Sequence, residues 1–168
     1  MTGTEPDYIG LGLFLEDWLL GRRFRTIGRT ITDADITNFV NATGMVEVLF
    51  TDLDYVAQSS SFKARPAPGI MVYAFAEGLQ MQAALQHTGI AYLGGEITVK
   101  TPCLAGDTIH VVVTVSETRP TSKPGRGIVT THNAVINQRG DTVLEYTAKR
   151  MVKSRMPQQK AAKGENSG

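Results

Sequence analysis

A long apolar segment followed by a change of period constrains the fold of this chain more than any other feature. After Gly69, residues 70–87 have the composition of a helix, with small residues placed between larger apolar ones. The larger apolar side chains are spread around much of the helix, and a helix of that kind is enclosed by the rest of its protein. They are Met71, Val72, Phe75, Leu79, Met81 and Leu85.

Beyond this helix the period falls to two, which indicates strands with one buried face. In residues 108–116 every second residue is a branched apolar one. Residues 128–136 and 143–152 are two further strands joined by a glycine-containing connection at 137–141, and residues 90–100 supply another. We therefore predict an α+β protein with the hotdog fold, in which an antiparallel sheet wraps around one long central helix.

Shorter elements precede the long helix. Residues 23–31 can form a first strand. Thr32, with an acid three residues later, has the spacing of a capping box that begins a helix over residues 33–42. Thr51 repeats the same start, which predicts a second short helix through Gln58.

Length and charge exclude several classes of protein. The 168 residues suit one domain over residues 1–156, followed by a polar tail at 157–168 that we expect to be disordered. A net charge of +1 without a basic cluster argues against nucleic acid, and no apolar stretch approaches the roughly 20 residues that span a bilayer. Cys103 is the single cysteine, so no internal disulfide can form, which fits a cytoplasmic protein.

Four segments in a fixed order carry a family resemblance. They are GRTITDADITNFVNATG at 28–44, FKARPAPGIMV at 62–72, LAGDTI at 104–109 and SKPGRGIV at 122–129. Together they resemble the MaoC-like family of (R)-specific enoyl-CoA hydratases and 3-hydroxyacyl dehydratases. The resemblance implies a hotdog dimer that binds an acyl thioester, of coenzyme A or of a carrier protein, in an apolar tunnel between subunits, with no cofactor and no metal.

The segment after Gly44 differs from the family at the positions of the family's catalytic residues. The family's catalytic Asp falls on Met45 and its catalytic His on Phe50. A thioether and a phenyl ring cannot exchange a proton, whereas general acid–base catalysis needs a titratable group within hydrogen-bond reach. Glu47, between the two positions, is the nearest replacement acid, although a solvated loop carboxylate is the favoured interpretation of this residue.

The resemblance also suggests a substrate-binding set. In the family, the backbone N–H that matches Gly69 contacts the thioester carbonyl oxygen, and first-turn N–H groups lack helical partners. A turn residue after Pro68 is the plainer interpretation of Gly69. The predicted substrate-binding residues are Met45, Val48, Phe50, Gly69, Met71 and Phe75.

Other polar residues allow two interpretations each. Glu77, on the long helix, needs either a partner or a cavity, or else it shares an exposed stripe with Gln80. Arg65, like the other basic residues of its motif segments, could meet coenzyme A phosphates or could be an ordinary loop charge. The three histidines match no metal-site spacing.

The sequence thus predicts the family more firmly than the reaction. The leading hypothesis is a MaoC-like hydratase/dehydratase protein that binds acyl-CoA after losing its acid–base pair. A non-catalytic partner subunit of a heteromeric dehydratase is an alternative, and the partner would then be an intact MaoC-like protein. A cavity repurposed for cyclisation or isomerisation, or a thioesterase, also remains open, so whether the chain is an enzyme stays undecided.

Overall fold

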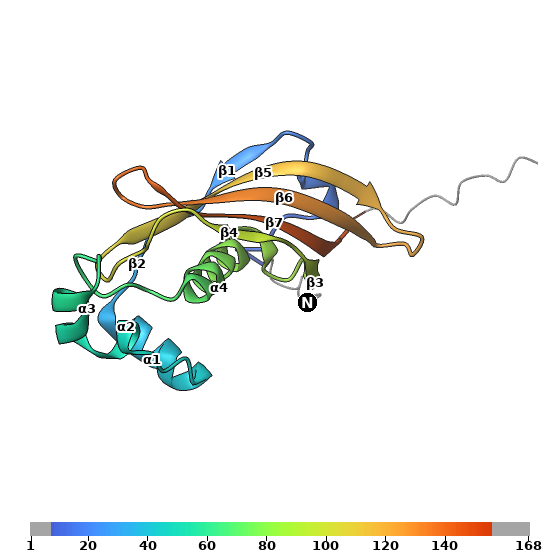
Figure 1. Cartoon of the computed structure of the whole chain (residues 1–168). Helices are drawn as coiled ribbons and strands as arrows, with labels where there is room; N and C mark the ends of the chain where they lie inside the picture. The colour runs from blue at the N-terminus through green and yellow to red at the C-terminus, as the bar shows by residue number, and fades with distance from the viewer. Residues whose placement is uncertain (1–7, 156–168) are drawn as a thin grey trace, which may run out of the picture.

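The computed structural model of the protein describes residues 8–155, so the predicted disordered tail at 157–168 lies outside the described residues. Its centre is an antiparallel sheet with the strand order β1-β5-β6-β7-β3, in which β2 also pairs with β5 and β4 with β7 (Figure 1). The three long strands are β5 at Thr108–Pro120, β6 at Arg126–Ile136 and β7 at Thr142–Lys153. The short ones are β1 at Arg23–Arg25, β2 at Arg29–Thr30, β3 at Gly89–Gly94 and β4 at Ile97–Val99.

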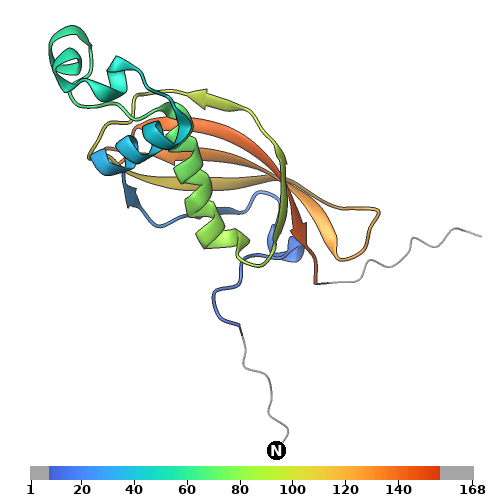
Figure 2. The same ribbon diagram turned by 90° about the horizontal axis from the view of Figure 1, so that it is seen from below.

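The long helix lies across one face of this sheet (Figure 2). Helix α4 spans Gly69–Gln80 and continues as a π-helical turn at Met81–Leu85. The alternation predicted for β5 is confirmed, since Ile109, Val111, Val113 and Val115 are all buried in the core that α4 shares. The α+β hotdog prediction is therefore confirmed.

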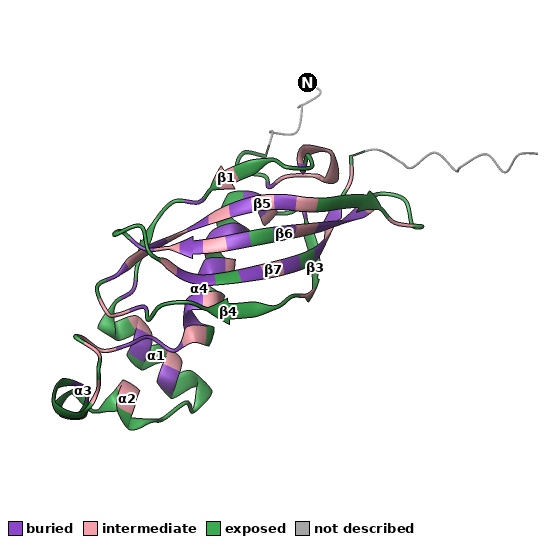
Figure 3. Ribbon diagram, turned by 45° about the horizontal axis from the view of Figure 1, so that its top comes forward, coloured by how far each residue is buried: buried purple, intermediate pink, exposed green. Residues whose placement is uncertain are grey.

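Helix α4 is not enclosed on every side, which corrects the expectation from its composition. Its buried residues are Met71, Val72, Ala76, Leu79 and Gln80. Ile70, Ala74, Gly78 and Met81 instead form an exposed stripe along the helix. Strands β3 and β4 are also largely exposed, and they lie at one edge of the sheet (Figure 3).

Two predicted strands are each divided. The segment 90–100 breaks between β3 and β4 because Gly94 has a φ of 130° and Gly95 approaches β7 closely. A Cβ atom at Gly95 would lie 1.9 Å from the carbonyl oxygen of Thr147, so no side chain fits there. The segment 23–31 likewise forms β1 and β2 rather than one strand.

The short helices lie together at one end of the sheet (Figure 1). Helix α1, Asp33–Thr43, has the predicted capping box, with the Asp35 N–H donating to Thr32 Oγ1 and the Thr32 N–H donating to Asp35. The predicted cap at Thr51 is wrong, because that segment forms two helices, α2 at Val48–Thr51 and α3 at Leu53–Ser59. They are capped by the carboxylates of Glu47 and Asp52, while the Thr51 hydroxyl donates to the Glu47 carbonyl.

Across residues 8–155, the structure contains no helix with both the length and the apolarity required to cross a lipid bilayer.

Candidate functional site

An apolar cavity of about 260 Å³ opens at the first turn of α4. We call it the first-turn cavity. Its walls come from the α2 segment, the start of α4, β4 and β7, and include Leu49, Phe50, Phe62, Gly69, Val72 and Val99. Its size is close to the lower end of the range for pockets that hold small ligands.

Gly69 places a backbone donor at this cavity. Pro68 precedes it, and the Pro68 carbonyl accepts hydrogen bonds from the N–H groups of Met71 and Val72 at 2.9 and 3.1 Å. Within residues 8–155 the Gly69 N–H donates to no acceptor, as expected of the first residue of a helix. A Cβ atom at Gly69 would lie 3.0 Å from Val99 Cγ2, so a larger side chain at this position would press against the β4 wall of the cavity.

Arg65 fixes the position of Phe50 in the cavity wall. Its Nε donates to the Phe50 carbonyl at 2.7 Å, and its Nη1 donates to Thr37 Oγ1 at 2.9 Å and to the Asp33 carbonyl at 3.2 Å. The side chain is mostly buried. Arg65 thus ties α1 to the α2 segment, an interaction that was not foreseen for a residue considered as a phosphate contact.

The predicted substrate-binding residues do not all lie together. Phe50 and Gly69 line the first-turn cavity, whereas Met45 and Val48 are 38% and 47% exposed and are not part of its lining. Met71 is completely buried in the core. Phe75 lies on another side of α4, where the Arg29 guanidinium sits 3.8 Å from its ring centroid.

The first-turn cavity has few groups capable of proton transfer. Its described lining contains two titratable side chains, Lys100 and Cys103. Lys100 pairs with Glu145 at 3.0 Å, and burial raises the pKa of the Cys103 thiol to about 12, which keeps it protonated at neutral pH. Glu47, the candidate acid, caps α2 by accepting the Leu49 N–H at 2.7 Å.

Glu77 is paired rather than exposed. It forms an ion pair with Arg150, and Gln80 is completely buried beside it, so the exposed-stripe interpretation is wrong for both residues. The two charges are 73 residues apart in the chain, and helical spacing alone could not have indicated the partner.

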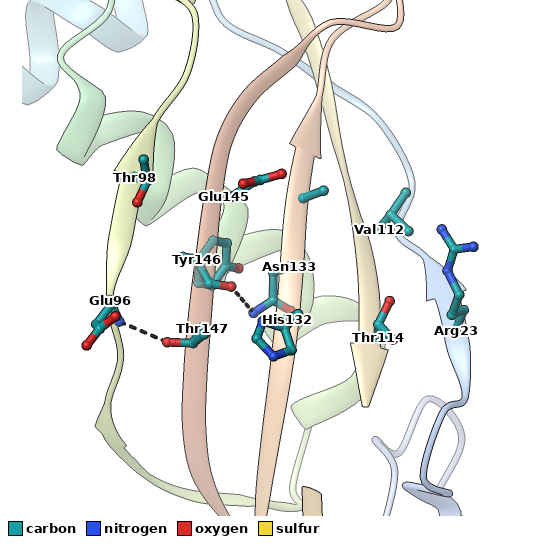
Figure 4. A pocket seen from close by; sticks show the side chains of 11 residues that line it. Arg23, Glu96, Thr98, Val112, Thr114, His132, Asn133, Glu145, Tyr146 and Thr147 are labelled. Carbon is teal, nitrogen blue, oxygen red and sulfur yellow. Dashed lines mark hydrogen bonds between the residues drawn. The ribbon is translucent and has the colours of Figure 1, made fainter. Parts of the chain in front are cut away.

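Another hollow, of about 370 Å³, lies on the face of the sheet away from α4 (Figure 4). Polar side chains such as Arg23, Thr114, His132 and Glu145 stand along it. The backbone of His132 pairs with β5 and β7, but among residues 8–155 its side chain takes part in no hydrogen bond and no ion pair. Nothing here resembles an assembled catalytic site.

The fold and the first-turn cavity together define a hotdog protein with a helix N-terminus facing an apolar chamber. The family model for the FAS1-like dehydratase domain region matches residues 19–146. The chain therefore belongs to this family of MaoC-like hotdog dehydratases, as the four sequence segments predicted.

Individual relatives agree with this assignment. The MaoC-like dehydratase from Rhodospirillum rubrum is 32% identical, with a TM-score of 0.75 over 86% of this chain and 99% of its own. A protein with a MaoC domain from Chloroflexus aurantiacus is 26% identical, with a TM-score of 0.83 over 94% of this chain and 45% of its own.

The β-methylmalyl-CoA dehydratase of Chloroflexus aurantiacus is 28% identical over 150 residues, which are 87% of this chain and 42% of that enzyme. The chain thus spans less than half the length of this relative.

Proposed function

We propose that this protein binds an acyl thioester of coenzyme A, with the thioester carbonyl at the Gly69 N–H and the first part of the acyl chain in the first-turn cavity. The observation that carries the proposal is the unpartnered Gly69 N–H at the wall of an apolar cavity. A free first-turn N–H and the helix dipole both favour the partial negative charge of a carbonyl oxygen. The family of the chain and the name of its β-methylmalyl-CoA dehydratase relative support this ligand class.

We further propose that binding here proceeds without the family's water chemistry. Phe50 occupies the cavity wall where the resemblance puts a histidine, and Met45 stands on the surface where it puts an aspartate. Neither side chain can accept or release a proton. Glu47 is engaged as a helix cap, which supports a binding role over a displaced acid.

The second subunit is expected at the β3 edge. β3 is the last strand of the sheet order and exposes Ile90, Tyr92 and Leu93. Met81, in the apolar stripe of α4, lines a cavity together with residues of β3. An unpaired strand edge beside exposed apolar side chains is a typical interface between subunits. A second copy would give a homodimer, and an intact MaoC-like subunit would supply the missing acid–base pair.

Two substitutions at one position test the carbonyl contact. Gly69→Pro removes the N–H, and proline is well tolerated at the first position of a helix. Gly69→Ala keeps the N–H while adding a Cβ atom, so it is the matched control. Isothermal titration calorimetry with octanoyl-CoA should show about tenfold weaker binding for Gly69→Pro than for Gly69→Ala. Equal affinities for the two variants would refute the contact, and absence of binding by the unchanged protein would refute the function.

A further inference from the structure

A second cavity, of about 250 Å³, lies beside the C-terminal half of α4. We call it the Glu77 cavity. Apolar side chains of α4, its π-helical turn and β3 form much of its wall, including Met81, Leu85 and Ile90. Glu77 and Arg150 are the charged residues of its described lining. A carboxylate at an otherwise apolar wall needs a reason, because such groups are rarely kept there without a partner.

One oxygen of Glu77 is held firmly. Its Oε1 accepts hydrogen bonds from the Tyr146 hydroxyl at 2.8 Å and from Arg150 Nη2. Tyr146 also accepts a hydrogen bond from the buried amide of Gln80, and Arg150 donates to Thr131 Oγ1 at 3.2 Å. All four of these surrounding residues are buried, so the carboxylate is fixed from the side of the sheet.

The other oxygen has no such partner. Among the side chains and backbone groups of residues 8–155, none donates a hydrogen bond to Glu77 Oε2. Glu77 lines the cavity, and its carboxylate charge is balanced by Arg150. A carboxylate whose charge is neutralised by an arginine can still accept a hydrogen bond, but it attracts a cation only weakly. It also repels an anion. A neutral hydroxyl is the group that such a site accepts best.

One residue of each cavity lies on the same face of α4: Gly69 lines the first-turn cavity and Glu77 lines the Glu77 cavity. Gly69, Tyr73 and Glu77 occupy successive i, i+4 positions, which lie above one another on a helix. Glu77 therefore lies about 12 Å further along the helix axis than the free N–H of Gly69. Tyr73, between them, packs edge-on against the Tyr146 ring with centroids 5.0 Å apart.

We propose that the protein selects acyl groups that carry a hydroxyl far from the thioester, and that Glu77 Oε2 accepts the hydrogen bond of this hydroxyl. The inference rests on the proposed function, because it takes the thioester carbonyl to be at Gly69. It adds a specificity determinant at the far end of the acyl chain, on a helical turn remote from the loop that carries Met45 and Phe50.

Calorimetry with three ligands tests the selection. The ligands are octanoyl-CoA, 8-hydroxyoctanoyl-CoA and 3-hydroxyoctanoyl-CoA. The unchanged protein should bind the 8-hydroxy ligand about tenfold more tightly than octanoyl-CoA, as one hydrogen bond to a charged acceptor provides. The 3-hydroxy ligand should bind like octanoyl-CoA, because its hydroxyl stays near Gly69. An equal gain from both hydroxyls would overturn the inference.

Two variants of different kinds should each remove the preference. Glu77→Met with Arg150→Met deletes the acceptor without leaving a buried charge unpaired. Met81→Trp, at an exposed wall residue, fills the cavity and leaves the ion pair intact. Glu117→Gln, on an exposed residue outside both cavities, is the control and should keep the tenfold preference.

The outcomes separate the two proposals. If no acyl-CoA binds, the proposed function fails and this inference fails with it. If all three ligands bind the unchanged protein equally, the proposed function stands and the Glu77 inference is overturned. A preference that survives in both cavity variants would also overturn it.

Discussion

The Glu77–Arg150 pair allows a quantitative test of what holds α4 to the sheet. The Arg150 side chain is 4% exposed and that of Glu77 is 13% exposed, so both charges lie largely out of water. Glu77→Met leaves the guanidinium without its anion, and breaking a buried pair in this way costs about 3–5 kcal/mol. Arg150→Met should lower the free energy of unfolding nearly as much. The loss should be slightly smaller because the unpaired Glu77 carboxylate lines a cavity and is more exposed than Arg150.

The double variant should recover most of that loss. With both charges gone, two buried polar groups lose a partner: the Tyr146 hydroxyl loses its acceptor and Thr131 Oγ1 loses its donor. The amide nitrogen of Gln80 contacts the Tyr146 hydroxyl, and its amide oxygen has no hydrogen-bond partner among the described residues, so a half-turn of the amide would let this oxygen accept from Tyr146 instead. We therefore expect the double variant to lie within about 1 kcal/mol of the unchanged protein.

Urea unfolding of the four proteins, followed by circular dichroism, gives the coupling energy directly. The expected value is about 3 kcal/mol or more, since each single change leaves one buried charge that the double change removes. Single variants that each lose less than about 1 kcal/mol, or losses that simply add in the double variant, would refute this account of the pair.

Three other predictions concern the first-turn cavity and its surroundings. The unchanged protein should not hydrate trans-2-octenoyl-CoA, while Phe50→His, which puts a titratable group in the cavity wall, should raise the rate by about 10²-fold over background in a spectrophotometric assay. Arg65→Ala should destabilise the protein by about 2 kcal/mol in urea and weaken octanoyl-CoA binding, because it releases the α2 segment. Burial raises the pKa of Asp107, whereas hydrogen bonds from Arg139 and other donors lower it. The hydrogen bonds together outweigh burial, so the pKa of Asp107 lies below its usual value. A depressed pKa stabilises the fold above the unfolded pKa, so the stability lost by Asp107→Asn at pH 7 should shrink as the pH falls below about 4.

The sequence pattern predicted correctly those helices and strands that are determined by neighbouring residues in the chain. The alternation in β5 follows from one buried face, and the capping box at Thr32 follows from a spacing of three residues. The division of segment 90–100 had a local sign in the pair Gly94–Gly95, but its cause is the contact of Gly95 with Thr147 on β7. A contact between segments so far apart in the chain cannot be inferred from either segment alone.

In the candidate site, too, some residues were predicted from the sequence and the roles of others were not. Phe50 and Gly69 were predicted from one motif resemblance, and both line the first-turn cavity. The roles of Arg65 and Arg150 were not predicted, because their partners lie on other elements that only the tertiary structure brings near. Charged residues that appear solvated in a sequence can thus be the ones that fix a site in place.

The distribution of polar groups along α4 argues for a division of labour between subunits. One end of the helix offers a free N–H to a carbonyl, and the Glu77 end offers a fixed carboxylate oxygen. In the complex that we propose, both contacts hold the ligand, but neither is arranged to add or remove water at a carbon next to the carbonyl. If turnover occurs on a ligand held in this way, its proton-transfer groups must come from outside the first-turn cavity. The open β3 edge is where a second subunit would bring them, so mixing this protein with an intact MaoC-like dehydratase should alter that enzyme's preference for acyl chains.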